Sequence, residues 1–220
     1  MPNWCDNQIT ITGPNSVIDK IEKIVKEESN NAENGLLQFF HPMPKELLET
    51  EAGPIAKTKK EKQARQIRKL EFGAENWYDW RVNNWGTKWE VCEFYGVDRQ
   101  HLNDSLDEST ISFSFSSAWA PPIGAYEKFL ENNSNCFLRA YYYEGGCDFM
   151  GLWEDGIDDC YAPSDYKSTD DFWQDGIGST LDDLFNMTES MAEYEAEQEA
   201  EKEDVHEYTK GKAMNIGEEV

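Results

Sequence analysis

The segment Asn84-Trp85-Gly86-Thr87-Lys88-Trp89 combines residue types that can bind a small ligand. Two tryptophans flank a glycine, at which the backbone can turn tightly, and Lys88 is the single cation between them. A cation enclosed by indole rings can hold an anion or stack on the rings. Trp119, just before two prolines, predicts either a rigid aromatic corner or a binding platform. The candidate binding residues are therefore Asn84, Trp85, Lys88, Trp89 and Trp119.

The same residues have a purely structural interpretation. Large aromatic side chains more often fill a core than form a site. Trp85 and Trp89 would then be buried, and Lys88 would extend its ammonium group to solvent along its apolar stem. We favour this core interpretation for the two tryptophans and keep the ligand site as the alternative.

Motifs for catalysis and metal binding are missing from the sequence. It contains no phosphate-binding loop, no dinucleotide-binding glycine pattern and no Gly-x-Ser-x-Gly nucleophile motif. A structural zinc site needs clustered histidines and cysteines, whereas His41, His101 and His206 are isolated and no Cys-x-x-Cys pair occurs. We therefore predict no catalytic residue, no cofactor and no metal.

One acidic turn could in principle hold calcium. The residues that flank it are Glu154, Asp155, Asp158 and Asp159. The pattern of a calcium-binding loop is absent, so we interpret this segment as a solvated turn.

The net charge is strongly negative and unevenly distributed. The 220 residues include 44 acidic and 20 basic side chains, a net charge of −24. Residues 1–140 carry a net charge of −5 and residues 141–220 a net charge of −19. Phosphate backbones and anionic membrane surfaces repel such a polyanion, which disfavours direct nucleic-acid and membrane binding.

Sequence features also bear on location. No apolar run approaches the roughly 20 residues of a membrane-spanning helix. The first five residues lack the basic and apolar regions of a signal peptide, so we expect none. Five widely spread cysteines indicate reduced thiols rather than a disulfide framework, which suits a cytoplasmic protein.

Hydrophobic periodicity predicts an α+β domain over residues 1–162. Alternating apolar residues predict strands, and apolar residues at helical spacing predict amphipathic helices. The order matches a ferredoxin-like β-α-β-β-α-β antiparallel sheet with helices on one face, extended by two more strands. The expected strands are 8–12, 90–95, 110–116, 137–143, 149–154 and 157–161, and the expected helices are 16–28 and 125–132.

Two segments lie outside this pattern. Residues 36–76 form an insertion, whose basic part, 54–72, we interpret as a solvated helix rather than a phosphate-binding arm. Residues 163–220 form an acidic C-terminal extension with a short helix at 180–187, followed by a marginal acidic helix or a disordered tail. The candidate acidic interaction face is Asp170, Asp171, Asp175, Asp182, Asp183, Glu189, Glu193 and Glu197.

Three motifs in order resemble those of a known family. They are Met1-Pro2-Asn3-Trp4-Cys5-Asp6-Asn7 with Ile9-Thr10-Ile11-Thr12-Gly13, then Asn84-Trp85-Gly86-Thr87-Lys88-Trp89-Glu90, then Phe115-Ser116-Ser117-Ala118-Trp119-Ala120-Pro121-Pro122. Residues 1 to about 160 are similar to the YubB-type ferredoxin-like proteins of plasmids and bacteriophages, which more often have a Thr and a Ser around the last tryptophan. The resemblance implies the ferredoxin-like fold and a mobile-element origin in a bacterial host cell. It implies no activity and no catalytic residues.

Three functions compete at this point. The first is a non-enzymatic accessory protein whose acidic face mimics DNA and binds a host protein with a basic, nucleic-acid-binding surface, as an inhibitor of a DNA-processing or defence enzyme. Acidity that serves only solubility is the alternative to this hypothesis. The second is a small-ligand or nucleotide-related enzyme using the Trp85–Trp89 segment. The third is single-strand nucleic-acid binding by the sheet aromatics Phe113, Phe115, Tyr141 and Tyr143, against which the charge argues.

Overall fold

The computed structural model describes residues 3–28, 34–53, 58–103, 107–189, 191–192 and 196. The chain divides into two compact units, residues 1–161 and 162–220, which we treat separately. Glu193 and Glu197 of the candidate acidic face, and most of the acidic run beyond Glu189, lie outside the described residues.

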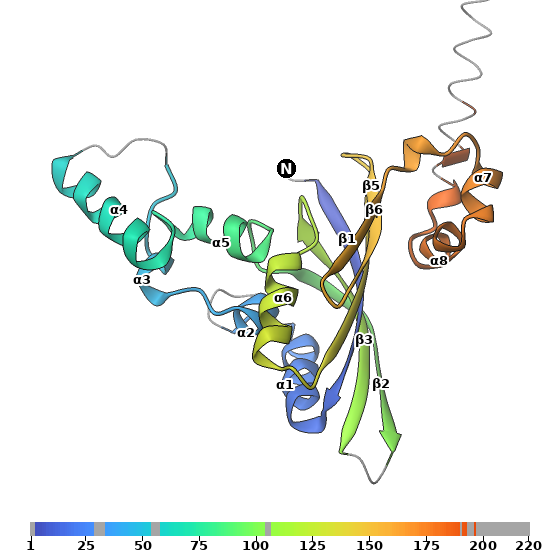
Figure 1. The fold of residues 1–220 in the computed structure, drawn as a ribbon, viewed down its shortest axis with the longest axis horizontal. Helices are drawn as coiled ribbons and strands as arrows, with labels where there is room; N and C mark the ends of the chain where they lie inside the picture. Colours follow the sequence, from blue (N-terminus) through green and yellow to red (C-terminus); the bar gives the residue numbers. More distant parts are fainter. Residues whose placement is uncertain are drawn as a thin grey trace, which may run out of the picture. The chain divides into compact units, whose positions relative to one another are not determined.

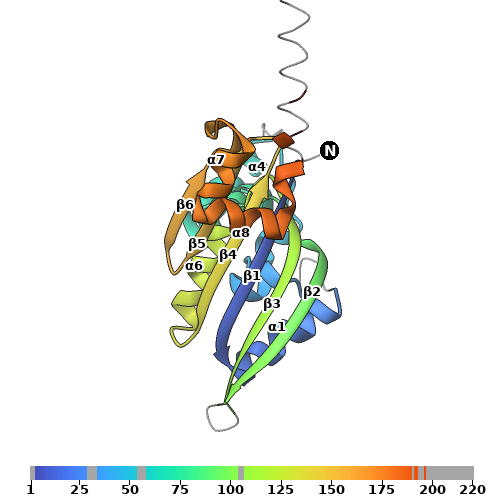
Figure 2. The same ribbon diagram turned by 90° about the vertical axis from the view of Figure 1, so that its right-hand side faces the viewer.

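The first unit is built on a six-stranded sheet. Its strands lie in the order β2-β3-β1-β4-β5-β6, and every neighbouring pair is antiparallel (Figure 2). In the central strand β1, Ile9 pairs with Phe113 of β3 on one side and with Ala140 of β4 on the other. The strands are β1 Trp4–Pro14, β2 Cys92–Asn103, β3 Glu108–Ala118, β4 Phe137–Glu144, β5 Phe149–Glu154 and β6 Ile157–Tyr161.

Two helices, α1 (Asn15–Lys26) and α6 (Ile123–Asn132), cover one face of this sheet (Figure 1). Every second residue of β1 is buried beneath them, because successive side chains of a strand point to opposite faces. Ile18, Ile21 and Val25 of α1 and Phe129 of α6 pack into the same core. The prediction of an α+β fold with an antiparallel sheet is therefore confirmed.

Between α1 and β2 the chain forms an arm that extends away from the sheet (Figure 1). Helix α2 Leu36–Phe40 packs into the core beside α1 and α6, and the arm contains α3 Lys45–Leu48, α4 Lys59–Phe72 and α5 Trp77–Trp85. The Thr58 side chain caps α4 by accepting a hydrogen bond from the Glu61 N–H, and Gly73 ends the helix in the left-handed conformation. Ile67 and Leu70 are exposed, as a solvated helix requires, but Arg65 is buried. The basic residues of α4 are thus not all solvated.

One local prediction was wrong in its extent, and one helix was not predicted. The strand expected at 90–95 begins at Cys92 and continues past Gly96 to Asn103, because Gly96 adopts a positive φ within an irregular part of the β2–β3 pairing instead of ending the strand. Residues Trp77–Trp85 form helix α5, which the aromatic-rich sequence concealed. The helix begins where the side chain of Asn76 accepts hydrogen bonds from two backbone N–H groups.

Among its described residues, the second unit forms η1 Pro163–Asp165, α7 Thr169–Gln174 and α8 Gly176–Phe185. The sequence predicted only the last, starting four residues later. Asp175 lies between α7 and α8 and caps α8 by accepting a hydrogen bond from the Ile177 N–H. Gly178 lies so close to the backbone of Phe172 that a side chain there would overlap it, so the absence of a Cβ allows α7 and α8 to pack closely. Among the residues that the structure describes, no helix is long and apolar enough to cross a membrane.

Candidate functional site: an aromatic cleft around Lys88

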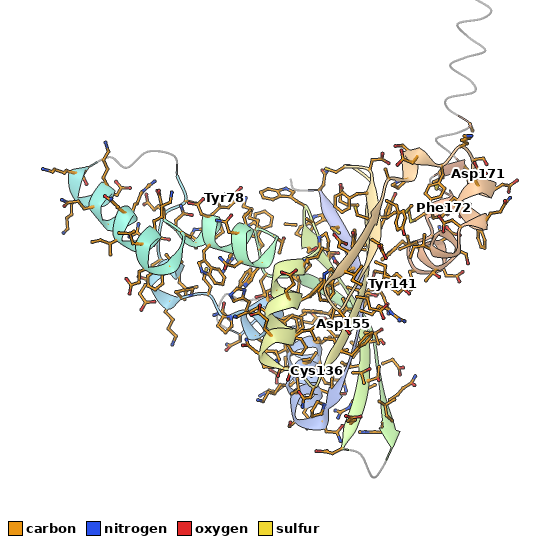
Figure 3. All side chains as sticks on the ribbon, in the orientation of Figure 1. Tyr78, Cys136, Tyr141, Asp155, Asp171 and Phe172 are labelled. Carbon is orange, nitrogen blue, oxygen red and sulfur yellow. The ribbon has the colours of Figure 1, made fainter. Side chains whose placement is uncertain are left out.

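An open cleft of about 580 Å³ lies in the arm of the first unit, and we call it the aromatic cleft. Three of its ten lining residues, Trp77, Tyr78 and Asp79, form the start of α5, and Tyr78 is labelled in Figure 3. The remaining lining residues come from the segment before α4, from α4 itself, from the residues just before α5, and from two positions after α5. They are Ala52, Gly53, Arg65, Glu75, Asn76, Lys88 and Trp119. Its aromatic side chains are Trp77, Tyr78 and Trp119, and its charged side chains are Arg65, Glu75, Asp79 and Lys88.

The ammonium group of Lys88 lies among three aromatic rings. Its nitrogen is 4.3 Å from the ring centroid of Trp89, 5.2 Å from that of Trp119 and 5.8 Å from that of Tyr78. These distances are typical of cation–π contacts. Within the described part of the chain, no carboxylate lies within 4.0 Å of this nitrogen. The charge is therefore balanced by ring faces and solvent.

Trp119 is held in an uncommon backbone conformation at the end of β3. Its φ angle is +74°, in the left-handed region that non-glycine residues seldom occupy, and its N–H donates a hydrogen bond of 3.0 Å to the Asn3 carbonyl. The side chain is 38% exposed and meets Tyr78 edge to face. Strained residues of this kind concentrate at functional sites, and here the strain presents an indole to the cleft.

The sequence motif that pointed to this site is split by the fold. Trp85 is fully buried, and its indole N–H donates a hydrogen bond of 2.8 Å to the His41 carbonyl. Asn84 turns its side chain back onto the Trp80 carbonyl. Gly86 ends α5 at a φ of +87°, so the chain reverses and carries Lys88 to the cleft. The core interpretation thus fits Trp85, whereas Lys88, Trp89 and Trp119 come together.

Sequence reasoning missed the α5 residues of the cleft. Trp77, Tyr78 and Asp79 form the first turn of that helix, and Asn76 accepts hydrogen bonds from the N–H groups of Tyr78 and Asp79. The signal that could have found them is the Asn76–Asp79 spacing, since an Asn with an acidic residue three positions later is typical of a helix start.

Glu90 is a buried carboxylate close to this segment in the sequence. It accepts hydrogen bonds from the N–H groups of Leu37 and Gln38, at the start of α2. Burial raises the pKa of Glu90 to about 7, against the lowering effect of these hydrogen bonds and of the nearby Arg81. The Arg81 guanidinium lies over the rings of Trp85 and Trp77. Trp77 also lines the cleft, so Arg81 lies between Glu90 and a cleft residue in this chain of contacts.

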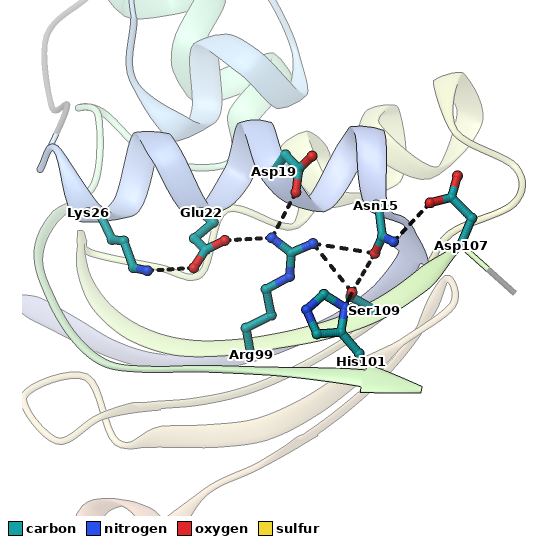
Figure 4. Close-up of polar contacts among 8 residues, drawn as sticks. All are labelled: Asn15, Asp19, Glu22, Lys26, Arg99, His101, Asp107 and Ser109. Carbon is teal, nitrogen blue, oxygen red and sulfur yellow. Dashed lines mark hydrogen bonds and ion pairs between the residues drawn. The ribbon is translucent and has the colours of Figure 1, made fainter. Parts of the chain in front are cut away.

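A separate polar network contains a serine and a histidine in contact (Figure 4). The Ser109 hydroxyl is 3.0 Å from Nδ1 of His101 and donates a hydrogen bond to the Asn15 side chain. Arg99 bridges this pair to Asp19 and Glu22 of α1. Ser109 is fully buried and its hydrogen is directed to Asn15, so the network ties α1 to β2 and β3 rather than presenting a nucleophile.

The candidate acidic face lies on the second unit, where its residues have unequal roles. Asp170, Asp171, Asp175, Asp183 and Glu189 are exposed, and Asp171 is labelled in Figure 3. Asp182 is half-buried and accepts a hydrogen bond from the Thr188 N–H. Asp175 also has a structural role, because it caps α8. Residues 162–189 carry seven acidic side chains and one basic side chain.

The sheet aromatics do not form one stacking surface. Phe113 and Phe115 are fully buried beneath the helices. Tyr141 and Tyr143 alternate along β4 with buried residues and lie on the opposite face of the sheet, beside Arg139. The grouping on which the single-strand hypothesis rested is therefore divided between two faces.

Acidic residues of the turn at 154–159 form contacts within the sheet, and the cysteines are unpaired. Glu154 forms a two-point ion pair with Arg139, and Asp158 accepts a hydrogen bond of 2.6 Å from the Tyr142 hydroxyl. All five cysteines are free thiols. Within the described ranges, no three His, Cys, Asp or Glu side chains are grouped so as to hold a metal ion.

No protein-family model and no curated protein matches this chain. A solved structure that resembles it is that of protein api92 from Yersinia pseudotuberculosis, described with the family DUF1281. The two chains are 13% identical, the match covers 75% of this chain and 96% of the other, and the TM-score is 0.37.

Proposed function

We propose that the first unit is a binding module that holds a planar, anionic small ligand in the aromatic cleft. The observation that carries this proposal is the position of the Lys88 ammonium group over the rings of Trp89, Trp119 and Tyr78. A carboxylate or phosphate group of a ligand would provide the counter-charge, and the exposed ring of Trp119 would stack on its planar part. Such stacking is worth about 1–3 kcal/mol per nucleobase.

Calorimetric titration of the full chain with 2-naphthyl phosphate and with inorganic phosphate tests the proposal. We expect the naphthyl compound to bind more tightly, since only it can stack. Lys88→Gln and Trp119→Ala should each weaken its binding about tenfold or more, a loss of about 1.4 kcal/mol. Trp173→Ala is the matched control, because Trp173 is comparably exposed but lies on α7 in the second unit. Equal affinities in all four proteins would refute the proposal.

A second candidate function rests on the second unit. We propose that its exposed carboxylates bind a basic, nucleic-acid-binding surface of a host protein, so that the chain acts as an accessory protein or inhibitor. The specific observation in its favour is that residues 162–189 carry seven acidic side chains and one basic side chain, four of the acidic ones on α7 and α8, which Ser168 and Asp175 cap.

The structure selects the variants for testing that candidate. Asp175 and Asp182 hold α8 and its C-terminal end in place, so reversing their charge would confuse binding with folding. Asp170→Lys with Asp171→Lys reverses two exposed charges instead. We expect this double variant to slow association with a purified basic DNA-binding protein, and added salt to slow wild-type association in the same way. If neither the double variant nor added salt changes the affinity, the acidic side chains serve solubility and not binding.

We further propose that strands β2-β3-β1-β4 with α1 and α6 represent the ferredoxin-like arrangement, and that the chain is related to the YubB-type proteins of mobile elements and works in the host cytoplasm. The antiparallel order, with β1 between β3 and β4, supports the fold proposal. A crystal structure in which β1 paired with β2 would contradict it.

A further inference from the structure

Lys88 is the cation of the aromatic cleft that is available to an anion. Arg65 also lines the cleft, but its guanidinium already donates hydrogen bonds to the Gly53 carbonyl, at 2.6 Å, and to Glu61, at 2.9 Å. The start of α5 is occupied as well. Its first N–H donates to the Thr50 hydroxyl, and the next two donate to the Asn76 side chain. Among the described residues of the cleft, one positive charge therefore remains for a ligand, which favours a ligand with one anionic group.

The cleft also contains an acceptor that is only partly used. Oδ2 of Asp79 accepts one hydrogen bond, of 2.7 Å, from the Asn76 side chain, and no described cation lies within 4.0 Å of this carboxylate. Glu75, the other acidic residue of the lining, lies 3.7 Å from Lys69 and 4.0 Å from Arg65. A carboxylate has about four acceptor sites, so Asp79 retains several for donors of a ligand.

Resting on the proposed function, we infer that the ligand of the aromatic cleft is a nucleoside monophosphate whose base presents N–H groups to Asp79. A nucleobase has a face that stacks on the indole of Trp119 and donors at its edge, and its phosphate pairs with Lys88. Guanine fits best, because its two adjacent N–H donors match the two oxygens of a carboxylate. A triphosphate would bring further negative charge to a chain of net charge −24 without meeting a second free cation in the described cleft.

Calorimetric titration of the full chain with guanosine monophosphate, guanosine, guanosine triphosphate and 2-naphthyl phosphate tests this inference. We expect the monophosphate to bind about tenfold or more tightly than guanosine, which lacks the anion, and than 2-naphthyl phosphate, which lacks the donors. The triphosphate should bind no more tightly than the monophosphate. A tighter triphosphate would overturn the single-anion part of the inference.

Asp79→Asn separates this inference from the proposal on which it rests. The variant should lose about tenfold in affinity for guanosine monophosphate, yet keep its affinity for 2-naphthyl phosphate, a difference that misfolding cannot produce. Asp98→Asn is the matched control and should bind both compounds as wild type does, because Asp98 likewise accepts a hydrogen bond from a side-chain amide but lies on β2, outside the cleft lining. If both compounds bind equally and Asp79→Asn changes neither, the nucleotide inference fails while the planar-anion proposal stands. If neither compound binds, both fail.

Discussion

The carboxylate of Glu90 accepts a hydrogen bond of 2.7 Å from the backbone N–H of Leu37, which lies 53 positions earlier in the chain. A second bond, from the Gln38 N–H, completes the contact. Helix α2 has only five residues, too few to persist without tertiary contacts. Glu90 therefore fixes the start of α2 against the segment that also carries Lys88 and Trp89.

This contact predicts a characteristic pH dependence of stability. Burial raises the pKa of Glu90 from 4.5 to about 7, so between these values the folded state binds more protons than the unfolded state. The contribution of Glu90 protonation to the unfolding free energy is fully present below pH 4.5. It is lost as the pH rises to 7, and the loss is about 3 kcal/mol at most. We will compare the unfolding free energies of wild type and Glu90→Gln, measured with urea from pH 5 to pH 8. We expect wild type to gain stability relative to Glu90→Gln as the pH falls.

His41 contributes to the pH dependence with the opposite sign. Burial lowers its pKa, so its contribution rises with pH. It is present in both proteins, and the wild-type-minus-variant difference cancels it. Parallel pH profiles of the two proteins would show that Glu90 does not titrate on folding in this range.

Gly35 should be intolerant of a side chain. A Cβ atom at this position would overlap the carboxylate of Glu90, which is held by α2 and cannot move away freely. Overpacking typically costs about 1–3 kcal/mol, and we expect Gly35→Ala to lie in this range by urea denaturation. Gly176→Ala is the control, because its Cβ would meet no atom within 4 Å. Equal stability of the two variants would mean that the Glu90 side chain rearranges without penalty.

Trp85 and Trp119 should respond differently to truncation. Trp85 is fully buried, and Trp80 and Arg81 contact its ring, so Trp85→Ala should lower the unfolding free energy by about 3–5 kcal/mol. Trp119 is 38% exposed, and Trp119→Ala should cost about 1 kcal/mol or less. Chemical denaturation with ligand titration on the same samples separates the roles. A large loss of stability in Trp119→Ala would make it a core residue and weaken the proposal for the cleft.

The sequence predicted the sheet well because its signal is local. Alternation in β1 and β3, and the apolar stripe of α1, each require one buried face, which places the helices on that face. The expected strands 149–154 and 157–161 leave Asp155-Gly156 as the turn between them, and both residues adopt positive φ there.

The cleft could not be derived in the same way. It depends on α5, whose aromatic residues conceal helical periodicity, and on contacts between Lys88 and residues distant in the sequence, Tyr78 and Trp119. The motif Asn84–Trp89 identified the correct segment but could not separate buried Trp85 from Lys88 in the cleft. That separation is made by the reversal at Gly86, which only the folded chain displays.

Arg99 and Arg139 offer a final comparison, since both form two-point contacts with carboxylates but at different depths. The Arg99 side chain is 15% exposed and contacts Asp19 and Glu22 of α1. The Arg139 side chain is 44% exposed and pairs with Glu154 on the adjacent strand. Exposed pairs are worth about 0–1 kcal/mol, and solvent and salt weaken them. Removing a partner from a more buried network costs more, because the remaining polar groups lose a hydrogen bond that water replaces poorly.

We expect Arg99→Met to lower the unfolding free energy by about 2 kcal/mol, and Arg139→Met by about 0.5 kcal/mol. In 1 M NaCl the Arg139 effect should vanish while most of the Arg99 effect persists. Equal losses that salt removes from both would make the Arg99 network an ordinary surface cluster with no role in holding α1 on the sheet.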